Sequence, residues 1–247
     1  MIVDQHRGLL YSIGKDRVIH IQRLRENQTE GIIKTSNARP CALEIDTELE
    51  RLYVATREGM VIIFNVKDPK QPVMVHAVRI IKQARMNKQP IDFVKQLDLD
   101  PDRNTLICRT KMGQISVMQL MNPLIRSQII EEIRAYEGQR EEMQTQFKWL
   151  SRMSCYVEGT QRGFMRVRDI EKGGECMLQL QTQFAEKVRM VHYNKKKNVL
   201  FAASRDGQFR VWKIPHEWRS KIIEEREMDA EYDRRRRSTV KNSMANS

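Results

Sequence analysis

The stretch that decides the fold reads VLFAASRDGQFRVWKIP, from Val199 to Pro215. A short apolar run ends in small residues, and Asp206-Gly207 then provides a tight turn. A second run follows, in which apolar and polar residues alternate around Trp212. Asp-Gly between two such runs is a strong short-range signal for a β-hairpin. The sequence therefore predicts two antiparallel strands that are joined at Asp206.

The hairpin recurs along the chain. When its turns are placed in one column, the members of that column are Asp16, Glu58, Met112, Arg162 and Asp206, separated by 42, 54, 50 and 44 residues. Small residues stand two positions before each turn, at Gly14, Thr56, Thr110, Thr160 and Ser204. Such self-similarity at a nearly fixed period indicates a repeat architecture.

Apolar residues fill further columns in all five copies. Fifteen positions before the turn stand Met1, Leu43, Leu97, Phe147 and Val191, and thirteen before it Val3, Ile45, Leu99, Trp149 and Tyr193. Six before it stand Leu10, Leu52, Leu106, Tyr156 and Leu200, and five after it Ile21, Ile63, Val117, Val167 and Val211. The spacing of two within a strand is the β period, so each copy predicts three antiparallel strands.

A fourth strand fits in four of the copies. The candidate segments are Gly31–Thr35, Val73–Ile80, Gln128–Arg134 and Met177–Gln181. A four-stranded meander that repeats every ~40–45 residues is typical of propeller blades, and such blades must stack to bury both faces. The sequence therefore predicts an all-β propeller of about five blades over residues 1–215.

The last copy resembles the WD40 family. That family ends its second strand with Ser/Thr-x-Asp and its third with Trp-Asp, and here Ser204-Arg205-Asp206 is followed by Trp212-Lys213. The family's Gly-His dipeptide is absent from every copy. The resemblance implies a propeller used as an assembly platform, with Ser204, Asp206 and Trp212 forming a partial version of the family's hydrogen-bond network. Blade stability must then come mainly from apolar packing between sheets.

The ring is expected to be incomplete. The first repeat begins at Met1, so no earlier residue could supply the closing strand that propellers use to remove an open edge. We expect either a truncated gene product or an open arc that another chain completes, although five blades can close a ring in principle.

The pattern changes after Pro215. Residues 216–233 read as a helix with Trp218 and Ile222 on its apolar stripe, and this helix either covers the open edge of the last blade or binds a partner. Residues 234–247 form a basic polar tail. In that tail a phosphorylation-like motif places four arginines before Ser238, namely Arg234, Arg235, Arg236 and Arg237.

Two insertions between strands are further candidates for binding, because propeller rims carry loops of this kind. Residues 68–92 contain a basic run of partner-binding candidates, namely Arg79, Lys82, Arg85 and Lys88. Residues 127–146 are rich in charge of both signs. Both segments can equally be long hairpins or solvated loops.

The net charge of +12 points to an acidic partner or to an ordinary solvated surface. Because the resemblance implies an assembly platform, we expect a non-enzymatic protein-interaction scaffold, a WD-repeat subunit of a larger multiprotein assembly. The alternative is a ribonucleoprotein component that contacts RNA phosphate through its basic surface. Recognition of phosphoinositides is less favoured, because no paired-arginine motif lies between the blades.

No pattern predicts catalysis. The five histidines are dispersed, and the sequence has no nucleophile elbow, phosphate-binding loop or zinc-protease motif. Four scattered cysteines have no zinc spacing, so neither a metal nor a cofactor is expected. No apolar run reaches the roughly 18 residues of a membrane span. Reduced thiols indicate the cytoplasm, with a cytoskeletal assembly or the nucleus as alternatives.

Overall fold

The computed structural model describes residues 1–26, 28–35, 37–81, 92–111, 113–121, 126–134, 147–150, 153–180, 182, 184–194 and 196–214. For residues 121 and 126–134 only the backbone is described. These residues form five antiparallel sheets, and in each sheet the neighbouring strands are consecutive in the chain. The described part of the chain is therefore a series of β-meanders.

The five sheets, numbered in chain order, contain nineteen strands. Sheet 1 consists of β1 (Ile2–Asp4), β2 (Leu9–Ile13), β3 (Val18–Arg23) and β4 (Gln28–Lys34). Sheet 2 consists of β5 (Pro40–Asp46), β6 (Arg51–Thr56), β7 (Met60–Asn65) and β8 (Val73–Arg79). Sheet 3 consists of β9 (Val94–Asp100), β10 (Thr105–Thr110), β11 (Gln114–Met121) and β12 (Arg126–Arg134). Sheet 4 consists of β13 (Phe147–Leu150), β14 (Cys155–Gly159), β15 (Met165–Asp169) and β16 (Glu175–Leu180). Sheet 5 consists of β17 (Val188–Asn194), β18 (Val199–Ser204) and β19 (Phe209–Lys213).

The strands lie where the repeat predicts them. Every copy contributes three strands around the two predicted turns, and the four expected fourth strands are β4, β8, β12 and β16, each within three residues of the predicted bounds. The predicted C-terminal helix of residues 216–233 and the tail of residues 234–247 lie outside the described residues. Within the described part, no helical segment has the length and apolar character needed to span a bilayer.

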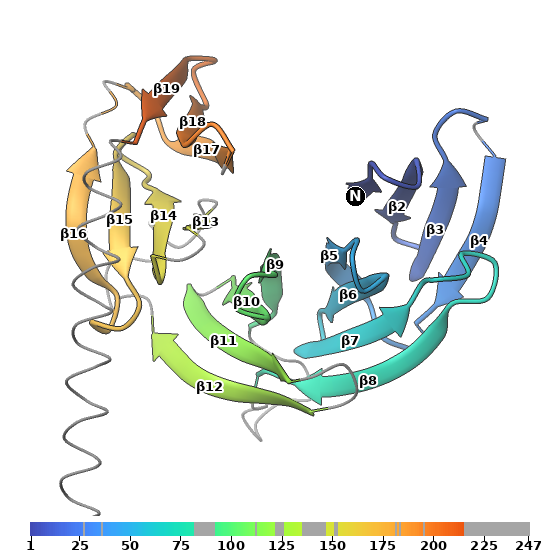
Figure 1. Ribbon diagram of the computed structural model, residues 1–247. Helices are drawn as coiled ribbons and strands as arrows, with labels where there is room; N and C mark the ends of the chain where they lie inside the picture. Colours follow the sequence, from blue (N-terminus) through green and yellow to red (C-terminus); the bar gives the residue numbers. More distant parts are fainter. Residues whose placement is uncertain are drawn as a thin grey trace, which may run out of the picture.

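The sheets follow one another along an arc (Figure 1). The first strand of each sheet lies on the inner side of the arc, and the fourth strand of sheets 1 to 4 lies on the outer side. Contacts connect β1 with β5, β5 with β9, β9 with β13 and β13 with β17, so consecutive sheets stack in chain order. Sheets 1 and 5 stand at the two ends of the arc.

The backbone at the turns repeats more strictly than the side chains do. In the first turn of every copy one residue is left-handed, with φ between 44° and 66°, at Gly8, Glu50, Asn104, Ser154 and Asn198. The carbonyl oxygen of that residue accepts a bond of 2.8–3.0 Å from the N–H sixteen residues later, at Leu24, Val66, Leu120, Ile170 and Ile214. This bond closes the three-stranded unit in each of the five copies.

Short polar side chains hold turns in several of the copies. The Asp4 carboxylate accepts bonds from the N–H groups of His6 and Arg7, and Asp46 does the same for the equivalent N–H groups of sheet 2. At the second turn the hydroxyls of Thr56, Thr110 and Thr160 each accept a bond from the N–H four residues later. This hydrogen bond accounts for the threonines in the column of small residues, because their hydroxyls supply a partner for a backbone N–H group of the turn.

The hydrophobic core lies between the sheets. Each sheet has a forward face, toward the sheet that follows it in the chain, and a backward face, toward the preceding one. In β6, Tyr53 and Ala55 pack against sheet 3, while Leu52 and Val54 pack against sheet 1. Sheets 2, 3 and 4 are thus buried on both faces, which explains why their strands are more uniformly apolar than strands with one solvated face.

Candidate protein-interaction surface

The forward faces of all five sheets are built from the same columns of the repeat. Five positions before the second turn stand Tyr11, Tyr53, Ile107, Val157 and Phe201. Three positions after it stand Ile19, Val61, Ile115, Met165 and Phe209, and five after it Ile21, Ile63, Val117, Val167 and Val211. In sheets 1 to 4 these side chains are buried, apart from the half-buried Val117, because the next sheet covers them.

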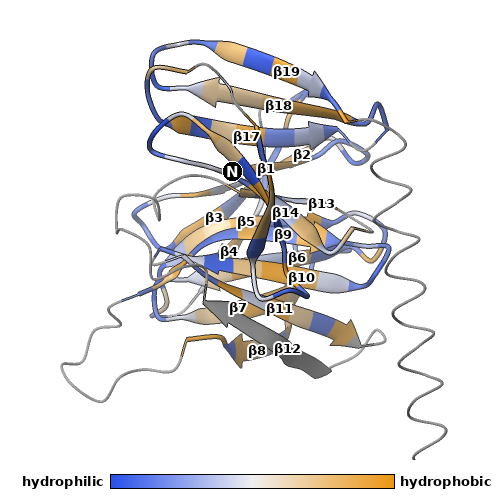
Figure 2. Cartoon of the chain, turned by 90° about the vertical axis from the view of Figure 1, so that its left-hand side faces the viewer, coloured by the Kyte–Doolittle hydropathy of each residue, from blue (hydrophilic) through white to orange (hydrophobic). Residues whose placement is uncertain are grey.

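In sheet 5 the same columns are open to solvent. Phe209 is 54% exposed, Val211 52% and Met190 on β17 43%. The Phe201 ring stacks on Phe209 with 5.9 Å between the ring centroids, and His192 lies 6.1 Å from Phe201 on the other side. Figure 2 shows hydrophobic colour along β18 and alternating colour along β19. Met190, His192, Phe201, Phe209 and Val211 form one apolar surface, the end face.

The opposite face of sheet 5 anchors it to sheet 4. Tyr193, Leu200 and Ala202 are buried in the core that the two sheets share. Gly159 on β14 lies so close to β17 that a Cβ atom there would stand 2.4 Å from the Cβ of Val188. The end face is therefore presented by a sheet that packs closely against its neighbour.

The backward face of sheet 1, at the other end of the arc, is chemically different. Val3 and Leu24 are 40% and 49% exposed, but Ser12, His20 and Gln22 lie between apolar residues on the same face. The His20 ring is 2.8 Å from the Asp16 carboxylate. The two ends of the arc thus differ, because the stacked phenylalanine rings lie at the sheet 5 end.

The structure brings together two of the three residues of the predicted network. The Ser204 hydroxyl contacts the Asp206 carboxylate and lowers the pKa of that carboxyl, with smaller contributions from the N–H groups of Gln208 and Ala185. Trp212 lies on β19, and its ring packs edge-on against Phe184 with 6.5 Å between centroids.

Only one of the predicted partner-binding residues lies within the described structure. Arg79 ends β8, and its guanidinium donates a 3.3 Å bond to the carbonyl of Glu58 across the second turn of sheet 2. Outside the described residues lie Lys82, Arg85, Lys88, Trp218, Ile222, Arg234, Arg235, Arg236, Arg237 and Ser238. For these residues the assignment stays a prediction.

A basic rim that the sequence analysis missed lies near the second turns of sheets 3 and 5. Lys95 has a lowered pKa because of burial and because of the positive charges of its neighbours Arg109, Lys187, Lys111 and Arg189. Nearby, the cations of Arg57 and Lys111 lie 5.3 and 5.9 Å from the centre of the Phe93 ring. The sequence contains a signal for this rim, because the residue before the second turn is basic in four of the five copies, namely Lys15, Arg57, Lys111 and Arg205.

Charged groups also lie on the inner strands and between the sheets. Lys148 on β13 pairs with Asp98 on β9 at 2.5 Å. Burial and the nearby Asp98 carboxylate raise the pKa of Glu44 on β5 to about 7, and Lys148 opposes this shift. No described group of three or more His, Cys, Asp or Glu side chains is arranged to hold a metal ion. The Lys148–Asp98 pair thus connects the inner strands of sheets 3 and 4.

A second set of buried charges joins sheets 3 and 4. The Glu158 carboxylate lies 2.5 Å from the Arg168 guanidinium and 3.7 Å from that of Arg109, whose side chain comes from β10. Arg168 also donates a 2.9 Å bond to the carbonyl of Gly174. Both guanidinium groups are almost completely buried.

Solved β-propeller structures resemble this fold. The β-propeller domain of Cps50 (Swd1) from Myceliophteria thermophila aligns with a TM-score of 0.63 at 14% identity, covering 87% of this chain and 64% of that one. Raptor from Chaetomium thermophilum aligns with a TM-score of 0.63 at 16% identity, covering 87% and 19%. A chain of the mitotic checkpoint complex aligns with a TM-score of 0.59 at 12% identity, covering 83% and 57%.

No family model matches the sequence, and no curated protein matches it. The likeness to the solved structures confirms the predicted fold, a WD40-like β-propeller arrangement of antiparallel sheets. This chain spans less than two thirds of the length of each of these three chains.

Proposed function

We propose that the chain is a non-enzymatic protein-interaction scaffold and a subunit of a larger multiprotein assembly. The end face of sheet 5 carries this proposal. In sheets 1 to 4 the equivalent positions pack against the sheet that follows in the chain. In sheet 5 the same positions are open to solvent. A contiguous exposed surface of aromatic and aliphatic side chains is characteristic of a protein-binding site.

The resemblance to a chain of the mitotic checkpoint complex supports the assembly role, because that structure is itself a multiprotein complex. The partner for the end face is expected to present apolar side chains. A second copy of this chain docking through sheet 1 fits less well, since Ser12, His20 and Gln22 would then lie against Phe201, Phe209 and Val211.

The proposal is tested by the size of the native complex. The full chain with Phe209→Ser and Val211→Ser is expressed with a tag in its own cells, and the complex is measured by sedimentation and native mass spectrometry. We expect the variant chain to shift to smaller particles. A control chain with Leu24→Ser and Leu49→Ser, which changes exposed leucines away from the end face, should stay in the large complex. Unchanged sedimentation of the end-face variant would refute the proposal.

The basic rim favours a second candidate function, binding of RNA phosphate. Clustered lysines and arginines attract a polyanion, and the affinity falls steeply with salt as counterions are released. Binding of a labelled single-stranded RNA to the full chain should then weaken by orders of magnitude between 0.05 and 0.2 M salt, as is usual for roughly six to ten phosphate contacts. Lys111→Glu with Lys187→Glu should abolish this binding. The absence of any binding at 0.1 M salt would leave the protein scaffold as the supported function.

A further inference from the structure

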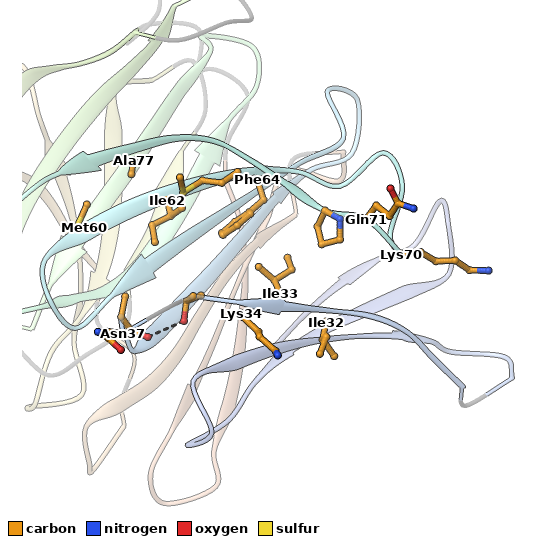
Figure 3. A pocket seen from close by; sticks show the side chains of 14 residues that line it. Ile32, Ile33, Lys34, Asn37, Met60, Ile62, Phe64, Lys70, Gln71 and Ala77 are labelled. Atoms are coloured by element: carbon orange, nitrogen blue, oxygen red, sulfur yellow. Dashed lines mark hydrogen bonds between the residues drawn. The ribbon is translucent and has the colours of Figure 1, made fainter.

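A groove with a volume of about 710 Å³ lies between sheets 1 and 2 on the outer side of the arc (Figure 3). Its apolar lining comes from both sheets. Ile33 on β4 and Ile62 and Phe64 on β7 are buried members of the core between the two sheets. Met60, Met74 and Ala77 extend this lining toward the surface.

The groove runs along the outer edge of β4. Four consecutive residues, Ile32 to Thr35, line it. Since side chains alternate between the two faces of a strand, consecutive residues can share a cavity only where the cavity follows the strand's edge. β4 is the end strand of its sheet, and among the described strands none pairs with its outer edge. The groove therefore offers backbone N–H and C=O groups as well as apolar contacts.

Both ends of this open edge are held in place. At one end the β7–β8 loop lies directly on β4, because a Cβ atom on Gly31 would stand 2.0 Å from the carbonyl oxygen of Pro69. At the other end the Thr35 hydroxyl lies 2.8 Å from the carbonyl oxygens of Arg17 and Ala38. Three residues of edge lie between Gly31 and Thr35, which are roughly 13 Å apart along the strand.

The charged residues that line the groove are all positive. Lys34 and Lys70 line it together with the neutral Asn37 and Gln71, and its lining contains no aspartate or glutamate. In Figure 3, Ile33 points toward Ile62 and Phe64, whereas Ile32 and Lys34 lie on the other face of β4. A strand added to β4 would therefore alternate between a side facing sheet 2 and a side facing Lys34.

We propose that this groove binds an extended peptide of a partner protein in which apolar residues alternate with acidic ones. The peptide adds a strand to β4 through backbone hydrogen bonds. Its apolar side chains insert beside Phe64, Met74 and Ala77 on the side of sheet 2, and its carboxylates lie on the other side, opposite Lys34, while Lys70 adds positive charge near the end of the groove. This site is separate from the end face of sheet 5 and depends on different residues.

Two fluorescein-labelled peptides test the proposal on the full chain by fluorescence anisotropy. One contains four Leu-Asp repeats and the other four Leu-Lys repeats. We expect only the acidic peptide to bind, and Lys34→Glu with Lys70→Glu to weaken it about tenfold or more, as for close charge pairs at other interfaces. Met74→Glu should also abolish binding, because it places a like charge among the apolar contacts.

Matched substitutions serve as controls. Val73→Glu changes the residue beside Met74, which is similarly exposed but does not line the groove, and Lys67→Glu removes an exposed lysine outside it. Neither change should alter binding by more than about twofold, because a rim charge contributes little. Equal binding of both peptides would overturn the proposal, as would acidic-peptide binding that survives Met74→Glu. Binding lost equally in the Lys67 control would show a general charge effect and would also overturn it.

Discussion

Glu158 shows how much a single buried side chain contributes to this fold. Its carboxylate lies between two guanidinium groups, Arg168 in its own sheet and Arg109 in the preceding one. Burial lowers the pKa of Arg109, and the charge of Glu158 opposes that shift. A buried charge is tolerated only when it is paired and hydrogen-bonded, and Glu158 supplies a carboxylate charge to both arginines.

Replacing Glu158 by glutamine is expected to destabilise the protein strongly. Glu158→Gln keeps the shape of the side chain but removes the carboxylate charge that lies between the buried Arg168 and Arg109 guanidinium groups, and breaking a buried ion pair typically costs about 3–5 kcal/mol. Urea unfolding of the full chain measures the loss. The control, Glu186→Gln, removes the exposed partner of Arg205 and should change the free energy of unfolding by at most about 1 kcal/mol. Similar losses in the two variants would contradict the role assigned to Glu158.

The turn between the second and third strand of each sheet also repeats in all five copies. One residue there is left-handed in every copy, and it is glycine in sheets 2 to 5 but Arg17 in sheet 1. A side chain in the left-handed region is strained by its Cβ atom, at a cost of roughly 1–2 kcal/mol. Sheet 1 therefore carries a strained turn that the other four sheets avoid.

Exchanging residues at this turn tests the strain directly. Gly207→Ala in sheet 5 should lower the free energy of unfolding by about 1–2 kcal/mol, because the backbone there has φ near 82° and a Cβ atom would meet no neighbour. Arg17→Gly in sheet 1 should raise it, by at most about 1 kcal/mol after the extra chain entropy of glycine is deducted. Both values come from urea unfolding. A stabilising Gly207→Ala would show that the turn is not constrained in this way.

At the scale of the whole molecule, the position of a sheet in the arc decides what its side chains do. Sheets in a repeat protein stabilise one another through their shared faces, so only the ends of the series differ. Val167 in sheet 4 and Val211 in sheet 5 occupy the same column and are the same residue type. Their exposed fractions are 2% and 52%, because a sheet follows the first, whereas within the described residues none covers the second.

Replacing each of these two valines by alanine should therefore lower the free energy of unfolding by different amounts. Val167→Ala should lower the free energy of unfolding by about 2 kcal/mol, since it removes buried methyl groups and leaves a cavity. Val211→Ala should change it by no more than about 0.5 kcal/mol, as is usual for exposed positions. Equal losses in the isolated chain would mean that the end face is covered, and would argue against its role as a docking surface.

The sequence alone determined the repeat, the strands, the turns and hence the fold, because strands and turns depend on residues that are near each other in the chain. The alternation of apolar residues, the Asp-Gly turn and the column of small residues are all local signals. They did not reveal the basic rim or the groove, whose residues come from different copies of the repeat. They also could not distinguish Val211 from Val167, since both columns read alike. Only the tertiary structure decided which faces are covered, because burial depends on the sheet that stacks opposite and not on the sequence of the strand itself.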